Sequence, residues 1–180
     1  MSRWEPMLER VAHERYPRLV AHAMLLVRSR EQAEDLVQDA LVATFTGKAR
    51  FASLAEAEQY VRRAIVSRFM DAARKRGRER AALVRHAARP VVVPEPADAP
   101  IADEVEDALA ELPPRERACV VLRHLEDLSV RDTAALLRIS EGAVKRYTAD
   151  GVARLGASLG ARPGDETVVH VTTKEVRRGA

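Results

Sequence analysis

The sequence of residues 128–155 predicts two short helices joined by a tight turn, and it restricts the fold more than any other segment. Ser129 and Ser140 each stand directly before an apolar helical pattern, where a hydroxyl can accept hydrogen bonds from the free backbone N–H groups of a first turn. Arg138 and Ile139 fall between the two patterns. The spacing predicts either a helix-turn-helix motif or a hairpin within an ordinary helical bundle.

The second of these helices has two different faces. Side chains expected to be buried recur at helical spacing on one face, namely Val144, Thr148, Val152 and Leu155. Away from that face lie Lys145, Arg146, Ala149 and Asp150. A narrow helix with a buried rear and a largely basic front fits the major groove of DNA, so the pattern favours DNA binding over a plain hairpin.

Composition and proline placement predict an all-α fold of two small helical domains joined by a proline-rich linker. The chain of 180 residues is 47% hydrophobic but only 4% aromatic, which favours helices packed through small aliphatic side chains. Four of its 9 prolines fall between residues 90 and 100, where they oppose helix formation. We therefore expect domains at 5–85 and 103–159, a linker at 86–102 and a flexible tail at 160–180.

Each expected domain contains its own helical patterns. In the first they cover residues 5–28, 31–46 and 56–84, with a loop at 47–55; in the second they cover 103–112 and 115–125 before the two-helix motif. Pro17 interrupts the first pattern. Ser29 is a candidate cap at the start of the second pattern, and Gly47 is expected to end it. Gly77 is expected to loosen the end of the long third helix.

The long third pattern is strongly basic at its end. Residues 62–80 hold eight Lys or Arg against one Asp and one Glu, which predicts contact with a polyanion unless this is simply a solvated helix face. Phe51 and Tyr60 are candidates for stacking on unpaired bases, although the pattern favours a place in the hydrophobic core for both.

An acidic and polar face precedes this basic helix. Glu34, Asp35, Gln38 and Asp39 can project from one side of their helix while Leu36, Val37, Ala40 and Leu41 pack behind them. Next to a basic helix, such a face suggests a protein partner with a basic surface. Taken alone, it would be interpreted as a solvated helix face.

Little in the sequence favours catalysis. Cys119, the single cysteine, lies on an apolar stripe and is expected to be a buried structural thiol. An enzyme using Cys119 with His124 is the weakest alternative, because no phosphate-binding loop or metal-ligand spacing accompanies them. We expect no catalytic residues, metal or cofactor. No membrane insertion is expected and no signal sequence is evident, which predicts a cytoplasmic protein.

Three motifs in order resemble those of bacterial RNA polymerase sigma factors of the extracytoplasmic-function (ECF) group. Residues 34–41 resemble the helix that binds core polymerase, and residues 60–76 resemble the helix that melts and reads the −10 element. Leu112-Pro113-Pro114, Arg117 and the following two-helix motif resemble the domain that reads the −35 element. The resemblance covers about residues 8–157.

The resemblance implies a role for each matched residue. Core RNA polymerase would be bound by Glu34, Asp35, Gln38 and Asp39. The −10 element would be contacted by Phe51, Ser53, Tyr60, Arg63, Ser67, Asp71, Arg74, Lys75 and Arg76, with a flipped base held near residues 51–57. The −35 element would be contacted by Arg117, Ser140, Glu141, Gly142, Lys145, Arg146, Ala149 and Asp150. Implied partners are core RNA polymerase, promoter DNA and, as for many members, an anti-sigma protein.

The chain departs from the family pattern at three of these positions. Ser67 replaces the usual Asn, Tyr60 replaces the commoner Trp, and Asp150 stands where a basic residue is frequent. A carboxylate near phosphate is unfavourable, but it can accept from a cytosine amino group. A stand-alone helix-turn-helix regulator is the alternative function, although it gives no reason for the acidic face.

Overall fold

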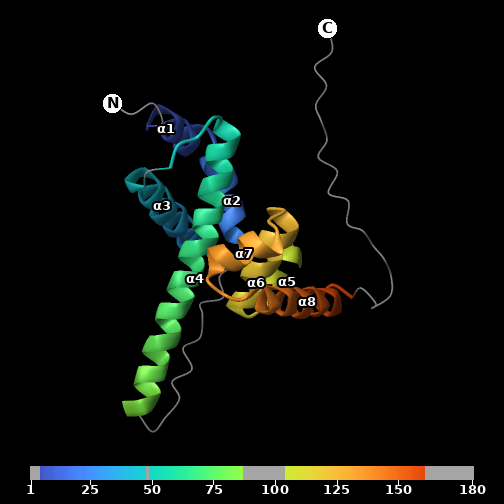
Figure 1. Cartoon of the computed structure of the whole chain (residues 1–180). Coiled ribbons are helices and arrows are strands. Elements are labelled where there is room, and N and C mark those ends of the chain that lie inside the picture. Colours follow the sequence, from blue (N-terminus) through green and yellow to red (C-terminus); the bar gives the residue numbers. More distant parts are fainter. Residues whose placement is uncertain (1–4, 48, 87–103, 161–180) are drawn as a thin grey trace.

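A computed structural model describes residues 5–47, 49–86 and 104–160, and the described residues form helices connected by turns (Figure 1). The N-terminal block consists of α1 (Glu5–Glu14), α2 (Tyr16–Met24), α3 (Arg30–Thr46) and α4 (Leu54–His86). The C-terminal block consists of α5 (Glu104–Glu111), α6 (Pro114–Val120), the π-helical turn η1 (Val121–Leu125), α7 (Val130–Leu137) and α8 (Glu141–Ser158).

Pro17 divides the first predicted helix into two. It lies in the first turn of α2, where its missing N–H removes no helical hydrogen bond and its fixed φ suits the start of a helix. Arg15 separates α1 from α2. The predicted interruption is therefore confirmed as a break between two helices.

The helix α3 begins and ends at capping residues that the sequence identifies. Ser29 is its N-cap, and its hydroxyl accepts a hydrogen bond from the backbone N–H of Gln32 at 3.1 Å. Gly47 is its C-cap, as predicted, in an extended conformation. Val37, Ala40 and Leu41 form the buried side of α3.

The helix α4 is longer than the sequence pattern indicates. It begins at Leu54, two residues before the predicted start, and runs without interruption through Gly77 to His86. The prediction that Gly77 loosens this end is wrong, because one glycine costs only about 1 kcal/mol in a helix interior. The last turns of α4 extend beyond the helices that pack against its first half (Figure 1).

The C-terminal block holds the predicted two-helix motif. Ser129 caps α7 by accepting from Asp132 N–H, and Ser140 caps α8 by accepting from Ala143 N–H. Arg138 takes a left-handed conformation with φ 55°, which turns the chain sharply between the helices. The predicted helix at 115–125 is only partly regular, because its second half is η1.

The two blocks pack directly against each other, which the sequence did not indicate. The helix α4 contacts both α6 and α7, and one continuous hydrophobic cluster joins buried side chains of both blocks. Phe69 and Met70 of α4 and Cys119 and Leu137 of the C-terminal block belong to that cluster. Most of the predicted linker and tail lies outside the described residues, so those predictions and the domain limits stay predictions.

Candidate nucleic-acid interface

The acidic face of α3 is presented to solvent as predicted. Asp35, Gln38 and Asp39 are exposed on the side opposite the buried Val37, while Glu34 is half-buried. Arg30 Nε donates to Glu34 Oε1 at 2.8 Å, an exposed pair one turn apart that contributes little to stability. Three of the four predicted polymerase-binding side chains are thus exposed and accessible to a partner.

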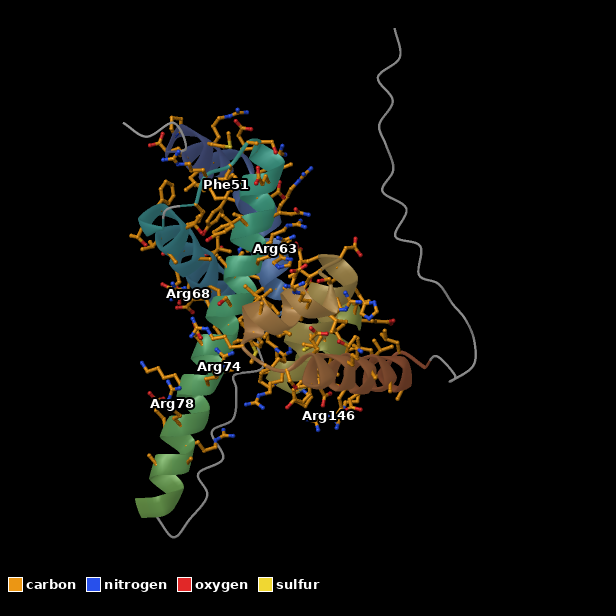
Figure 2. All side chains as sticks on the ribbon, viewed as in Figure 1. Phe51, Arg63, Arg68, Arg74, Arg78 and Arg146 are labelled. Atoms are coloured by element: carbon orange, nitrogen blue, oxygen red, sulfur yellow. The ribbon has the colours of Figure 1, made fainter. Side chains whose placement is uncertain are left out.

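A cleft of about 720 Å³ borders this face. Asp35 and Asp39 lie on the α3 side of the cleft, and Arg68, Lys75 and Arg76 lie on the α4 side. Opposite charges therefore face the same groove, as the juxtaposition of an acidic helix and a basic helix in the sequence suggests. Arg68 and Arg78 follow one another along α4 in Figure 2.

The start of α4 is fixed by a capping box that sequence reasoning missed. The Ser53 hydroxyl accepts from Glu56 N–H at 3.1 Å, and the Glu56 carboxylate accepts from Ala52 N–H at 2.7 Å. The signal was present as Ser53-Leu54-Ala55-Glu56, the Ser-x-x-Glu pattern of a helix start. This box orients the loop that carries Phe51.

Phe51 and Tyr60 form an aromatic pair beside that loop. Their ring centroids are 5.2 Å apart with an interplanar angle of 60°, an edge-to-face arrangement. Phe51 is partly buried against the core, whereas Tyr60 is 43% exposed. The prediction that Tyr60 faces the core is therefore wrong, and its ring is accessible to a base.

The other predicted −10 residues of α4 differ in accessibility. Lys75 and Arg76 are exposed, whereas Arg63, Ser67 and Arg74 are half-buried. Arg63 and Ser67 line a cavity of about 250 Å³ that Leu136 of α7 also lines. Asp71 accepts from Arg74 at 2.8 Å, so that pair is held within one turn.

The recognition face of α8 is largely as predicted. Lys145, Arg146, Ala149 and Asp150 are all exposed, and Val144 is fully buried on the opposite side. Arg146 lies over the ring of Tyr147, 4.9 Å from its centroid, and projects from the outer side of α8 in Figure 2. The residues of the first turn, Ser140, Glu141 and Gly142, are also exposed.

One side of α8 is packed differently from the prediction. Val152 is 45% exposed, and Gly151 occupies the buried position instead. A Cβ at Gly151 would lie only 2.7 Å from Val120 Cγ2, which shows how closely α8 approaches α6. The helical pattern predicts that Val152 is buried because valine is apolar. In the structure α6 and α8 are so close that the buried position is taken by Gly151, which has no side chain.

Arg117 lies between the two blocks rather than beside Lys145 and Arg146. Its guanidinium donates to the carbonyl oxygens of Leu26, Ala110 and Leu112, and it lies 5.6 Å from the ring centroid of Phe69. In this arrangement Arg117 of α6 connects the segment just after α2, the end of α5 and the middle of α4. Its predicted contact with the −35 element stays a prediction.

Cys119 is fully buried, as predicted, and burial raises the pKa of its thiol to about 11. The thiolate that a nucleophile requires is therefore disfavoured at neutral pH. Within residues 5–47, 49–86 and 104–160, no cluster of three or more His, Cys, Asp or Glu could hold a metal ion. In the same ranges, no helix is long and apolar enough to cross a membrane.

The exposed surfaces define a helix-turn-helix protein whose N-terminal block presents an acidic face and a basic helix. Comparison with known families agrees with this class. Residues 11–79 match the model of sigma-70 region 2, and residues 102–155 match that of sigma-70 region 4.

The chain is also similar to named sigma factors over most of its length. It is 32% identical over 143 residues to the ECF RNA polymerase sigma factor SigM of Mycobacterium tuberculosis, covering 77% of this chain and 69% of that protein. It is 31% identical over 176 residues to the RNA polymerase sigma-E factor of Streptomyces avermitilis, covering 93% of each. The chain therefore belongs to the ECF group of the sigma-70 family of RNA polymerase sigma factors.

A solved structure shares the fold. The sigma factor RpoE of Bartonella quintana, determined in complex with the anti-sigma factor NepR, matches with a TM-score of 0.57 and 24% identity. The match covers 84% of this chain and 95% of that chain, so both helical blocks are included.

Proposed function

We propose that this sigma factor docks on core RNA polymerase through the acidic face of α3 and carries the polymerase to a subset of promoters. The observation that carries the proposal is the exposure of Asp35, Gln38 and Asp39 on one face of α3, in a chain that matches sigma-70 region 2. Their carboxylates suit a basic polymerase surface. The polymerase supplies the chemistry, and the complex works in the cytoplasm.

In this proposal α4 and its preceding loop stabilise the melted −10 element. Tyr60 offers an exposed ring to a flipped base, and the Phe51 ring holds Tyr60 in an edge-to-face contact. Stacking of a base on such a ring contributes about 1–3 kcal/mol, enough to offset the cost of unstacking that base. Lys75 and Arg76 are exposed and supply positive charge for the phosphates.

The helix α8 reads the −35 element in the major groove. Lys145 and Arg146 project from its exposed face, and Asp150 on the same face is a candidate acceptor for a cytosine amino group. The exposed first turn of α8, where Ser140 caps the helix, can approach phosphates through its backbone N–H groups. An anti-sigma protein is a further proposed partner, because the structural neighbour was solved with one.

The docking role is tested by exchanging both Asp35 and Gln38 for Arg and measuring affinity for purified core polymerase. The change adds three positive charges to the proposed contact, so we expect a loss of affinity of at least about tenfold. The matched control exchanges Glu9 and His13 of α1 for Arg, which also adds three positive charges at two exposed positions one turn apart. Equal affinities of the two variants would contradict the proposal.

Promoter direction is tested by abortive transcription with core polymerase on a library of promoter sequences. We expect the wild-type chain to initiate from a subset of the library and the α3 variant to initiate from few or none. Tight binding of duplex DNA by the protein alone, without polymerase-dependent initiation, would instead support a stand-alone regulator.

A further inference from the structure

The side chain of Tyr147 on α8 contacts two arginines that come from different helices. Its hydroxyl accepts a hydrogen bond from Arg115, in the first turn of α6, at 3.1 Å. The guanidinium carbon of Arg146 lies 4.9 Å from the centroid of the Tyr147 ring, and that of Arg115 lies 6.0 Å from it. One aromatic side chain therefore contacts a positive charge from each of the two helices.

The ring of Tyr147 is fixed, whereas both arginines reach solvent. Tyr147 is half-buried and packs against the hydrophobic cluster, while Arg115 and Arg146 are exposed. A free arginine side chain has many rotamers and loses that freedom when it binds a ligand. Contact with a fixed ring restricts the two side chains in advance, which lowers the entropic cost of binding.

The direction of Arg146 is not the one that an isolated helix would favour. Neighbouring residues of a helix point about 100° apart, so side chains at i and i+1 do not normally face each other. Arg146 nevertheless lies over the ring of the next residue along α8. The ring of Tyr147 thus determines where the guanidinium of Arg146 lies on the outer side of α8 (Figure 2).

The two guanidiniums carry charge that nearby acidic side chains do not balance. Within the part of the chain that the structure describes, neither Arg115 nor Arg146 forms an ion pair with a carboxylate. The hydrogen bond from Arg115, together with the neighbouring charge of Arg146, lowers the pKa of the Tyr147 hydroxyl. Two like charges beside one ring repel each other, so this surface suits a ligand that offers anionic groups or hydrogen-bond acceptors.

On the basis of the proposed reading of the −35 element, we propose that Tyr147 is a positioning residue with two separate tasks. Its ring holds the guanidinium of Arg146 for bidentate hydrogen bonding to the edge of a guanine. Its hydroxyl holds Arg115 beside the DNA backbone, which adds a phosphate contact from α6 to the base contacts of α8. Tyr147 acts through these two arginines and does not itself read a base.

The task of the ring is tested by base preference. Core polymerase carrying the full chain is incubated with promoter duplexes whose −35 element is randomised, and the bound duplexes are sequenced. Tyr147→Leu should reduce the preference for guanine at one position by at least about fivefold and leave the other positions unchanged. Tyr147→Phe keeps the ring and should keep this preference. Tyr16→Leu is the matched control, because Tyr16 is another partly buried tyrosine of the hydrophobic cluster.

The task of the hydroxyl is tested by salt dependence. Affinity of the same polymerase complex for the most enriched duplex is measured by fluorescence anisotropy at several salt concentrations. Arg115→Ala should reduce the slope of log K against log salt by about 0.9, because one phosphate contact is lost. Tyr147→Phe should reduce the slope by a smaller amount, and combining the two changes should add nothing to Arg115→Ala. Arg18→Ala, which removes an exposed charge from α2, should leave the slope unchanged.

Thermal unfolding establishes whether each variant is folded. A folded Tyr147→Leu protein with wild-type base preferences would overturn the task of the ring. Unchanged slopes for Arg115→Ala and Tyr147→Phe would overturn the task of the hydroxyl, and both of these variants keep the ring, so they remain decisive if Tyr147→Leu does not fold. A wild-type complex that enriches no −35 sequence would instead contradict the proposed function.

Discussion

Replacing Gly151 with alanine should destabilise the protein, although alanine normally favours a helix. Gly151 lies inside α8 at its closest approach to α6. An added Cβ would lie 2.7 Å from Val120 Cγ2 and 3.4 Å from both the Cβ and the carbonyl oxygen of Glu116. The first distance is well inside van der Waals contact, and the backbone oxygen prevents α8 from simply moving along α6.

The size of the effect follows from two opposing contributions. Overpacking of one methyl group in a packed interior costs about 1–3 kcal/mol, whereas glycine to alanine in a helix gains about 1 kcal/mol. Gly77→Ala in α4 is the matched control, because an added Cβ there meets no atom of the described residues within 4 Å beyond its own stretch of helix. Both variants gain the same stabilisation from replacing glycine with alanine in a helix. The difference between their unfolding free energies should therefore equal the overpacking cost of about 1–3 kcal/mol.

Thermal unfolding followed by circular dichroism at 222 nm measures this difference. For a chain of this size 1 kcal/mol shifts Tm by roughly 2–4 °C, so Gly151→Ala should melt roughly 2–12 °C below Gly77→Ala. Adding Val120→Ala to Gly151→Ala removes the clashing methyl group, and the double variant should lose less stability than the two single losses combined. Equal Tm values for Gly151→Ala and Gly77→Ala would refute the claimed close approach.

Three further results are expected. Burial lowers the pKa of His22 to about 4, so the folded form binds fewer protons than the unfolded form below about pH 6.5. Stability should therefore fall between about pH 6.5 and 4, measured as Tm against pH, and His22→Gln should flatten that fall. Burial also raises the pKa of Glu126, which acts in the opposite direction, so Glu126→Gln should steepen it. Ser140→Ala removes the cap of α8 and should cost about 1 kcal/mol in urea unfolding, while Ser158→Ala at the other end should cost less. Arg146→Ala should weaken duplex DNA binding and, if Arg146 meets a phosphate, reduce the slope of log K against log salt by about 0.9, whereas Ala153→Ser, an exposed change on α8, should leave the slope unchanged.

Local structure was predictable wherever neighbouring residues determine it. Ser29, Ser129 and Ser140 cap the helices that the sequence assigned to them, and Gly47 ends α3 as expected. Each of these caps depends on a hydrogen bond between residues three or four apart. Neighbouring residues in the sequence are therefore enough to predict it. The exposed faces of α3 and α8 followed from helical spacing for the same reason.

The errors arose where distant residues decide the outcome. Val152 was assigned to the core because it is apolar, but the approach of α6 to α8 selects Gly151 for the buried position. Tyr60 was assigned to the core by its spacing, but it is 43% exposed and packs edge-to-face with Phe51. A helical period identifies a face of a helix, whereas burial depends on which other helix covers that face.

The close packing of the blocks has a consequence for binding that no single helix shows. Phe69 and Met70 are 2% and 3% exposed, and both belong to the hydrophobic cluster that continues into the C-terminal block. Separating the blocks would expose part of this surface and leave the charge of Glu126 without Arg62, so opening requires free energy. A partner that binds only the open form would lose apparent affinity in proportion to the small open population. A partner of α3 avoids that loss, because the acidic face of this helix is exposed while the two blocks are packed together.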